Sequence, residues 1–441
     1  MKLTYLASAT VIVEVGSCRI LMDPWLTDGE YYGAWAQYPA FDWRGWSFED
    51  IDFIYVSHIH PDHINAETMR RLPKSIPVLI HSYEAKFLRR SIEALGFEVR
   101  ELPHNRRVQL KDSAYIKILA ADDCNPELCG RFYGCAKFEV RLGSTQIDSL
   151  CVIDDGRHVL VNVNDCPRKL SRHLMPKIKS AYGHVDMLLV GYGGAGPYPQ
   201  CFGNLTEAQK IAGAAAKERK FLEQAVGYIH ELAPRYYLPF AGQYTLCGRL
   251  SQLDDYRGVP ELDEAATYLG VASPGSRCAL LNCGATFDIA SGQPSTDYVP
   301  IDIDRKRAYR DEVLAERALA YDGDDPPGQA ELETLVKSAF GRLAAKRREI
   351  GFESNTTVYV DLASDHLARV PMRNEELSIV PTPLEEPHVR ITADPKLLRR
   401  LLSGPRLAHW NNAEIGSHLR YERRPDVYER GLYYTMCFFH A

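Results

Sequence analysis

The feature that most constrains this chain is a cluster of three histidines and one aspartate directly after an apolar segment. The cluster reads Ser57-His58-Ile59-His60-Pro61-Asp62-His63 and follows residues 51–56. Side chains alternate along a strand, so a strand ending in His-x-His directs both imidazoles to one side. Asp62 and His63 follow at a turn, where the chain can fold back toward the same point. These donors suit zinc, iron or manganese better than magnesium or calcium, so the pattern predicts a metal site rather than a solvated histidine-rich loop.

Composition narrows the class of protein and its partners. At 441 residues the chain is expected to form two or three domains. The net charge of −6 and the absence of a basic stripe argue against nucleic acid as a partner, and we expect a small-molecule substrate. Eleven cysteines without Cys-x-x-Cys pairs are typical of reduced thiols in a cytoplasmic protein. No apolar run reaches membrane-spanning length, so no membrane partner is expected, and the oligomeric state is left open.

The amino-terminal segment resembles a signal peptide only superficially. Its apolar residues are interrupted by Thr4, Ser8 and Thr10, and the stretch passes into Glu14 with the alternation of a strand. We therefore interpret it as the first strand of the fold.

Hydrophobic periodicity divides the chain into a strand-rich first half and a mixed second half. The predicted strands are 2–6, 9–15, 18–22, 52–57, 77–81, 97–102, 114–120, 136–142, 149–154, 158–163, 186–191, 236–240, 356–361, 387–392 and 414–421. The predicted helices are 66–72, 83–95, 168–180, a long helix from the N-cap Thr206 to Leu232, 329–349, 394–403 and 426–438. Tyr321–Gly328, acidic and rich in proline and glycine, is the best linker candidate. The expected domains are 1–250, an extension and linker at 251–328, and a small α+β domain at 329–441.

Two segments together resemble the metallo-β-lactamase superfamily. They are Leu21-Met22-Asp23-Pro24-Trp25 and the His-x-His-x-Asp-His cluster, and the resemblance covers about residues 1–245. It implies an α+β fold, an αββα sandwich with a metal site at the edge of two β-sheets. It also implies that His58 and His60 bind one metal, and that Asp62 and His63 bind a second.

The same resemblance implies a carboxylate that bridges the two metals. Asp165, in Val161-Asn162-Val163-Asn164-Asp165-Cys166, occupies the matching place, although a turn or helix N-cap would also explain an aspartate there. Asp62 and Asp165 are then the candidate catalytic carboxylates.

The chain departs from the family pattern at two expected ligands. Where a third histidine should follow the strand 115–120, the chain offers Asp122, with Asp123 as a rival. Where the last histidine should follow Leu238-Pro239, the chain continues without one, as Phe240-Ala241-Gly242-Gln243-Tyr244. An aspartate in place of an imidazole moves the preference from zinc toward iron or manganese, and a missing ligand leaves one position open for water, O2 or substrate.

Later segments resemble the catalytic region of CMP-N-acetylneuraminate hydroxylases more closely. These segments are Val185–Phe202, Pro234–Gly242 and Asn282–Asp288. Those hydroxylases carry a Rieske cluster, whereas this chain has no C-x-H…C-x-x-H pair to hold one. Oxygen would then be activated at the His/Asp site, as a diiron centre supplied by an external electron donor. Diiron hydroxylases of platensimycin-type diterpenoid biosynthesis have this fold, and the chain resembles a member of that kind.

We therefore expect a non-haem iron oxygenase with two iron ions, a monooxygenase that hydroxylates a bulky, partly apolar substrate such as an acyl or nucleotide conjugate. Zinc or manganese is the alternative metal. The alternative function is a metal-dependent hydrolase of an ester, amide or phosphodiester, in which a metal-bound water attacks. A third interpretation is a binding protein with a relict metal site.

Three further segments have two interpretations each. The aromatic stretch Trp25–Phe48 is either core or a lid that grips an apolar substrate. Gly191–Gly196 either contacts a phosphate or forms ordinary turns. Val389–Gly404 weakly resembles sterol-carrier-like domains, and a dimerisation or structural module is the alternative.

Overall fold

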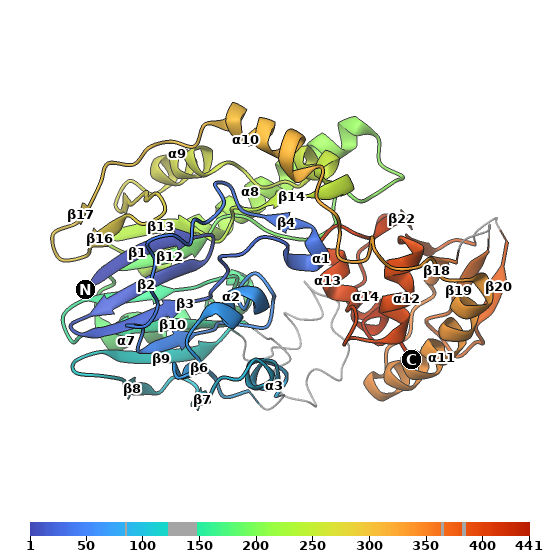
Figure 1. The fold of residues 1–441 in the computed structure, drawn as a ribbon, viewed down its shortest axis with the longest axis horizontal. Helices are drawn as coiled ribbons and strands as arrows, with labels where there is room; N and C mark the ends of the chain where they lie inside the picture. The colour runs from blue at the N-terminus through green and yellow to red at the C-terminus, as the bar shows by residue number, and fades with distance from the viewer. Residues whose placement is uncertain (84–85, 122–147, 363–365, 382–384) are drawn as a thin grey trace.

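The amino-terminal part of the chain forms two β-sheets that pack face to face (Figure 1). The computed structural model describes residues 1–83, 86–121, 148–362, 366–381 and 385–441. Within them, the first sheet has the order β17 (Gln293–Pro294), β16 (Thr286–Asp288), β1 (Lys2–Ala7), β2 (Thr10–Val15), β3 (Cys18–Met22), β5 (Phe53–Tyr55), β6 (Val78–His81) and β7 (Val99–Leu102). The second has the order β15 (Arg277–Cys278), β13 (Tyr236–Phe240), β12 (Met187–Gly191), β11 (Val159–Asn162), β10 (Ser149–Asp154), β9 (Tyr115–Ala120) and β8 (Arg107–Gln109).

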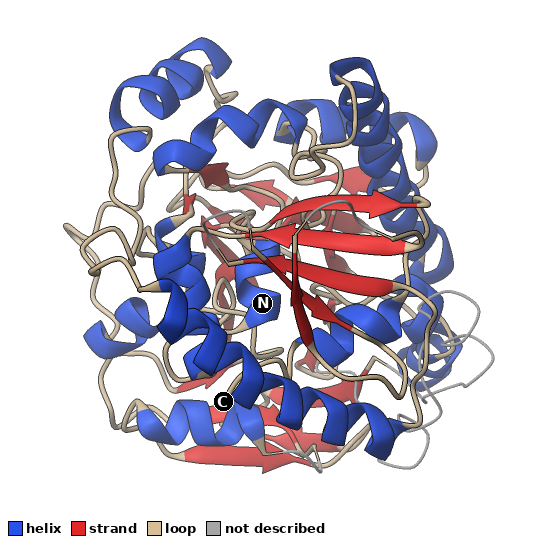
Figure 2. Ribbon diagram, turned by 90° about the vertical axis from the view of Figure 1, so that its right-hand side faces the viewer, coloured by secondary structure: helices blue, strands red, loops and turns tan. Residues whose placement is uncertain are grey.

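The two sheets share one apolar core and bury their outer faces under helices. Alternate residues of the strands point inward, so Val11 and Val13 of β2 meet Ile116 and Ile118 of β9 in the same cluster. On the outer face of the first sheet lie α2 (Ala66–Arg71) and α3 (Phe87–Ala94). On the outer face of the second lie α7 (Leu174–Tyr182), α8 (Glu207–Leu232) and α9 (Leu262–Ala272). The expected αββα sandwich is confirmed, and Figure 2 shows strands in the middle with helices around them.

The long helix α8 begins and ends where the sequence predicts. The Thr206 hydroxyl accepts a hydrogen bond from the Gln209 amide, and the Gln209 side chain accepts one from the Thr206 amide, which completes a capping box. At the other end Ala233 adopts a left-handed conformation with φ of 46°, directly before Pro234. None of the described helices is long and apolar enough to cross a membrane.

The carboxy-terminal part adds a second, smaller α+β unit, coloured orange to red in Figure 1. Its sheet has the order β20 (Ser378–Val380), β19 (Leu367–Val370), β18 (Thr357–Asp361), β21 (His388–Thr392) and β22 (Arg420–Arg424). Its helices are α11 (Gln329–Ile350), α12 (Pro395–Ser403), α13 (Trp410–Ile415) and α14 (Arg430–Met436).

The carboxy-terminal unit shares its apolar core with the sandwich. One cluster of buried side chains contains Val358 and Leu401 from this unit together with Trp25, Trp35 and Leu246 from the other. The two units are therefore packed together through side chains that each would otherwise expose to water.

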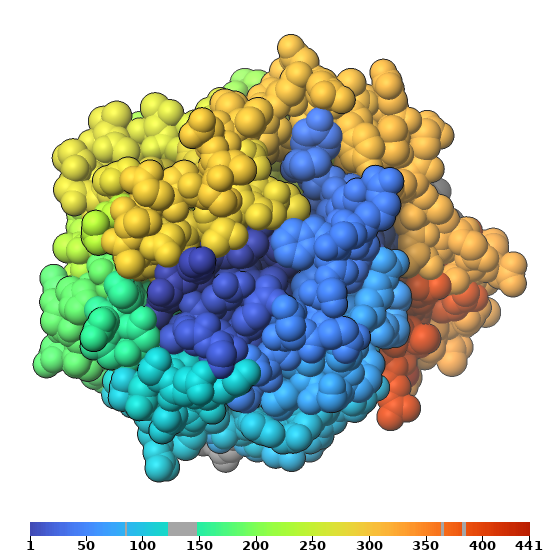
Figure 3. All heavy atoms as spheres, turned by 60° about the vertical axis from the view of Figure 1, so that its left-hand side comes forward, coloured from blue at the N-terminus to red at the C-terminus, as the bar shows by residue number. Residues whose placement is uncertain are grey.

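Short elements fill the space between these layers. They are the turn α1 (Glu30–Gly33), the strand pair β4 (Trp35–Ala36) and β14 (Thr245–Leu246), the helices α6 (Arg168–Ser171) and α10 (Ile303–Tyr309), the 3-10 helix η1 (Gly248–Tyr256) and the π-helical turn η2 (Arg310–Leu314). The yellow segment in Figure 3, near residues 280–300, lies beside the dark blue amino-terminal strands, in agreement with the pairing of β16 with β1. Tyr321, at the start of the proposed linker, is buried in the shared core.

Several predicted elements differ in the structure. A strand at 414–421 is wrong: α13 continues to Ile415, the chain turns at Gly416 and Ser417, which has φ of 64°, and only then does β22 begin. The helix expected at 168–180 is two helices, α6 and α7. The strands β19 and β20 have no counterpart in the prediction. The strand predicted at 136–142 lies outside the described residues.

Candidate metal centre

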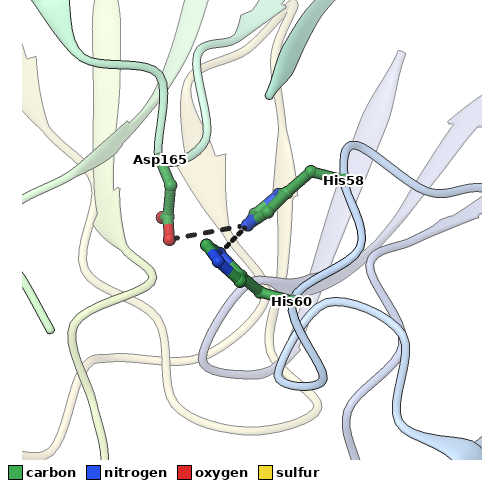
Figure 4. Close-up of side chains that lie close together, drawn as sticks. All are labelled: His58, His60 and Asp165. Carbon is green, nitrogen blue, oxygen red and sulfur yellow. Dashed lines mark hydrogen bonds and ion pairs between the residues drawn. The ribbon is translucent and has the colours of Figure 1, made fainter. Parts of the chain in front are cut away.

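Five of the six predicted ligands come together at one edge of the sandwich. His58, His60, Asp62 and His63 lie on the loop after β5 of the first sheet, and Asp165 lies on the loop after β11 of the second (Figure 4 shows His58, His60 and Asp165). Because β5 ends at Tyr55, the histidines sit in the loop beyond the strand. Strand alternation therefore does not explain why these side chains converge. The turn that follows the strand brings them together. Asp122 and its rival Asp123 lie outside the described residues.

The ligand atoms form two groups that share Asp165. In the first group His58 Nε2 lies 2.9 Å from His60 Nδ1 and 3.9 Å from Asp165 Oδ2. In the second group His63 Nε2 lies 3.3 Å from Asp165 Oδ2 and 3.6 Å from Asp62 Oδ2. Four donors around a transition ion at about 2.0–2.1 Å lie roughly 3.3 Å from one another, so both groups have the spacing of a metal site.

The loop that carries Asp165 depends on a glycine in the neighbouring strand. Asn164 adopts a left-handed conformation with φ of 46°, and its amide donates to the Asn162 side chain at 3.0 Å. A side chain on Gly191, at the end of β12, would place Cβ 3.2 Å from the Asn164 carbonyl oxygen and 3.9 Å from Asp165 Oδ1. Gly191 thus lets this loop pack closely against the sheet.

The next two glycines of the same stretch also serve packing. A Cβ at Gly193 would lie 2.8 Å from Val259, and one at Gly194 would lie 2.0 Å from the Phe221 ring. The close approach of neighbouring side chains accounts for both glycines without a ligand.

His58 is held as a neutral ligand. Its ring is fully buried, and burial lowers its pKa well below the ordinary value, helped by the neighbouring His63 and His60. Its Nδ1 lies 2.8 Å from the Ser57 hydroxyl, which fixes the ring and leaves Nε2 to face His60 and Asp165. A neutral imidazole with one nitrogen directed at two other donors is the form that binds a metal.

His63 is held between carboxylates on both sides of its ring. Burial lowers its pKa, but Asp165 and Asp62 outweigh burial and hold the pKa well above the ordinary value. Partial burial of the Asp165 carboxyl group by itself raises its pKa. The charges of His63 and His60 outweigh this effect and hold the pKa of Asp165 below its ordinary value. The protonated ring supplies a positive charge between carboxylates, and a bound cation would supply that charge in its place.

Asp23 supports His63 from behind. Its Oδ1 accepts a hydrogen bond from the Ser57 amide at 2.7 Å, and its Oδ2 lies 3.3 Å from His63 Nδ1. Asp23 is fully buried, and burial raises its pKa, partly offset by His63. This is the arrangement in which a carboxylate orients a ligating histidine from the side opposite the metal. The prediction from sequence used Asp23 only as part of the family motif and missed this role.

Tyr31 contacts the other carboxylate of the second group. Its hydroxyl donates to Asp62 Oδ1 at 2.5 Å, and the Tyr31 ring is buried. Burial, together with the charge of Asp62, raises the pKa of Tyr31 well above its ordinary value, so the phenol keeps its proton. The sequence indicated Tyr31 only as one of many aromatic residues, because no local pattern marks a tyrosine that reaches a ligand 31 positions away.

The aromatic stretch divides into two parts. Trp25, Tyr31 and Trp35 lie in the core shared with the carboxy-terminal unit, and Trp35 stacks on Tyr244 with ring centroids 3.7 Å apart. The later aromatic side chains pack against the outer face of the first sheet; they are Phe41, Trp43, Trp46 and Phe48. In the first part, Tyr31 contacts the ligand Asp62 directly.

The segment that lacks the expected last histidine is held to the first sheet. After β13 the chain turns at Ala241, with φ of 54°, and the Gln243 side chain accepts a hydrogen bond from the Tyr5 hydroxyl at 2.9 Å. Among the described residues, one further carboxylate approaches the centre: Asp148 Oδ1 lies 3.9 Å from His58 Nε2, the same distance as Asp165 Oδ2.

Comparison with known proteins agrees with this architecture. Residues 2–122 match the family model of the beta-lactamase superfamily domain. A Mycobacterium tuberculosis protein named as a Rieske 2Fe-2S iron-sulfur protein is 27% identical over 247 residues, which are 55% of this chain and 44% of that protein. The cytidine monophosphate-N-acetylneuraminic acid hydroxylase of Mus musculus is 26% identical over 253 residues, 55% of this chain and 39% of that enzyme.

This chain therefore spans less than half the length of these two relatives. Among solved structures, CmlA, a diiron beta-hydroxylase from Streptomyces venezuelae, superposes with a TM-score of 0.41 at 17% identity, over 65% of this chain and 53% of that one. The sandwich and the histidine cluster at its edge accompany the match over residues 2–122, and this part of the chain is therefore similar to the beta-lactamase superfamily domain.

Proposed function

We propose that the protein is a metal-dependent oxidoreductase, a non-haem diiron enzyme that hydroxylates a bulky, partly apolar substrate. The observation that carries the proposal is the pair of donor groups that share Asp165. Such a shared carboxylate suits two neighbouring cations. The hydroxylase from mouse, 26% identical over 253 residues, supports the hydroxylation chemistry.

The donor set fits iron. Imidazole nitrogens and carboxylate oxygens in similar number suit iron and manganese as well as zinc, and no thiolate from the described residues joins either group. Bound iron would supply the redox chemistry that oxygen activation needs, with two electrons from an external donor. The protein side chains would hold the two ions. His58 and His60 would bind one ion, Asp62 and His63 the other, and Asp165 lies between the two groups.

Buried aromatic side chains lie directly behind the second donor group. Tyr31 contacts both Asp62 and Trp35, with the Tyr31 and Trp35 ring centroids 4.5 Å apart, and Tyr244 stacks on Trp35. Aromatic side chains bury large apolar areas with little loss of conformational freedom. An acyl or nucleotide conjugate would combine an apolar or planar portion with a polar one.

Iron content and oxygen uptake test the proposal. Protein produced with iron should contain two ions per chain, and after chemical reduction it should consume O2. The variant Asp165→Asn should lose most of its metal because both groups lose their common oxygen donor. Asp155→Asn is the matched control and should keep both ions, because Asp155 is a partly buried aspartate that binds His158 after the end of β10 opposite Ser149. Full activity of the protein with zinc as its only metal and in the absence of oxygen would refute the proposed oxidoreductase function.

A metal-dependent hydrolase is the second candidate. The Asp165 side chain is 37% exposed, so water can reach the shared carboxylate. Its lowered pKa keeps it ionised and able to orient an attacking water. Hydrolysis of an ester, amide or phosphodiester that is equally fast with and without oxygen would favour this candidate.

A further inference from the structure

The short turn α1 links the metal centre to the carboxy-terminal unit. Tyr31 and Tyr32 both have left-handed backbone conformations, with φ of 49° and 58°. Such conformations are unfavourable for side chains other than glycine. They persist where surrounding contacts hold them, so the contacts of α1 identify what the turn depends on.

The Tyr31 carbonyl oxygen accepts a hydrogen bond from the Ala34 amide at 3.2 Å within the turn and a second one from the loop between α13 and β22. His418 Nε2 donates to the Tyr31 carbonyl oxygen at 2.6 Å, and His418 Nδ1 accepts from the Tyr321 hydroxyl at 3.0 Å. Burial lowers the pKa of His418 to about 4, so the ring is neutral and carries a single proton, at the nitrogen that faces Tyr31. The two hydrogen bonds use both nitrogens of this one tautomer.

The same loop also fits the side chain of Tyr31. A Cβ on Gly416 would lie 2.8 Å from Tyr31 Cβ and 2.8 Å from His418 Cδ2, so only glycine allows this approach. Next to it, Tyr32 Oη accepts a hydrogen bond from the His409 amide at 2.7 Å. Both tyrosines are thus fixed by the carboxy-terminal unit, but only Tyr31 continues to the metal centre.

The Tyr31 hydroxyl determines how Asp62 presents its oxygens. Oδ1 of Asp62 accepts a hydrogen bond from the Tyr31 hydroxyl, and Oδ2 faces His63 Nε2 in the second donor group. Without the tyrosine, the carboxylate could rotate and exchange its two oxygens. Partners of this kind orient ligands, and their loss typically costs 10–100-fold in metal affinity.

We propose that the carboxy-terminal unit, acting through His418 and Tyr31, fixes the orientation of Asp62 and so completes the second cation position of the metal centre. Tyr31 is a positioning residue, because it acts through Asp62. This inference rests on the proposed metal-dependent function. On this proposal, residues 410–424 of the carboxy-terminal unit contribute to the metal centre and do not belong to an independent module.

A pair of adjacent variants tests the role of Tyr31. Tyr31→Phe removes the hydroxyl that binds Asp62, and Tyr32→Phe removes a hydroxyl from the same left-handed turn that does not bind Asp62. Metal-free protein is titrated with Co²⁺ against a chelator, and the visible spectrum of each bound ion is recorded. Tyr31→Phe should bind one of two ions 10–100-fold more weakly, with a changed spectrum for that ion. Tyr32→Phe should match the wild type within about twofold.

A second pair tests the role of the carboxy-terminal unit. His418→Leu removes the donor to the Tyr31 carbonyl, and His418→Gln can restore it through its side-chain amide. The leucine variant should lose affinity at the same ion as Tyr31→Phe, and the glutamine variant should recover it. Two results would overturn this inference and leave the proposed function standing. One is wild-type affinity in both Tyr31→Phe and His418→Leu, and the other is an equal loss in Tyr31→Phe and Tyr32→Phe. A wild-type protein that binds no Co²⁺ would overturn the proposed function as well.

Discussion

At the scale of single residues, the side chains that orient the ligands matter as much as the ligands themselves. His63 has Asp165 and Asp62 on one side of its ring and Asp23 on the other. The carboxylate of Asp23 is buried and also accepts the Ser57 amide, so it cannot move away from the ring without losing that hydrogen bond. Asp23 therefore holds the ring with Nε2 directed at the metal position.

Replacing Asp23 by asparagine should weaken metal binding without removing a ligand. The asparagine can still accept the Ser57 amide, but it no longer places a carboxylate beside His63 Nδ1. We expect a 10–100-fold lower affinity for the ion that His63 binds, measured by competition with a chelator. Asp52→Asn is the control, because Asp52 lies just before β5 and pairs with Lys111 and the Arg19 amide. Equal losses in the two variants would contradict a role specific to Asp23.

The metal ligands could be predicted from the sequence better than the residues that orient them. His58 to His63 lie within six positions, so the cluster is visible without any knowledge of the fold. Asp165 was identified only through the family resemblance, which implies a bridging carboxylate after a later strand. The contact of His418 with Tyr31 spans 387 positions and depends on the packing of two units, which leaves no local pattern in the sequence.

At the scale of secondary-structure elements, the turn α1 and the loop after α13 fit each other closely. The approach is possible because Gly416 has no side chain. The prediction of a strand at 414–421 was wrong at this point, because Gly416 and Ser417 end a helix before β22 begins. Strands of the sandwich with continuous apolar runs, such as β10 and β12, were predicted within a residue or two because both of their faces are buried.

Two glycine-to-alanine substitutions should act in opposite directions. In Gly416→Ala the new methyl group would overlap Tyr31 Cβ, and we expect a loss of about 1–3 kcal/mol in the free energy of unfolding. Gly341 lies inside α11 with open space around it, so Gly341→Ala should add about 0.5–1 kcal/mol. Denaturant unfolding of metal-free protein measures both. A Gly416→Ala protein as stable as the wild type would show that the contact between α1 and the loop is loose.

At the scale of the whole molecule, the two units share one core and one buried histidine. His418 is 5% exposed and joins Tyr31 of the sandwich side to the β22 side of the carboxy-terminal unit. Its neutral form is favoured by burial and by the charge of Arg249, whereas Asp322 and Asp394 act in the opposite direction. The stability of the packed molecule should therefore depend on pH through this residue.

The sign of that dependence follows from the lowered pKa. Unfolded histidine has a pKa near 6.5 and folded His418 one of about 4, so the unfolded state binds more protons between these values. The stabilisation is fully present above pH 6.5 and is lost as the pH falls toward 4. Between pH 7.5 and 5 the loss from this residue should be about 2 kcal/mol.

The variant His418→Gln isolates this contribution, because glutamine does not titrate. His409, whose pKa is also lowered to about 4, contributes equally to both proteins and cancels in the comparison. Unfolding at the two pH values should show a decrease smaller by about 2 kcal/mol in the variant than in the wild type. Identical pH dependence would mean that His418 is not kept neutral by the fold.

The wide separation of Asp62, Asp165 and His418 along the chain has a consequence for biosynthesis. A growing polypeptide leaves the ribosome from its amino terminus, so the histidine loop emerges before Asp165, and Asp165 emerges before the loop with Gly416 and His418. Any ion captured by the histidine loop alone would meet an unfinished set of partners. Faithful loading of both positions would then await synthesis of the loop that carries Gly416 and His418.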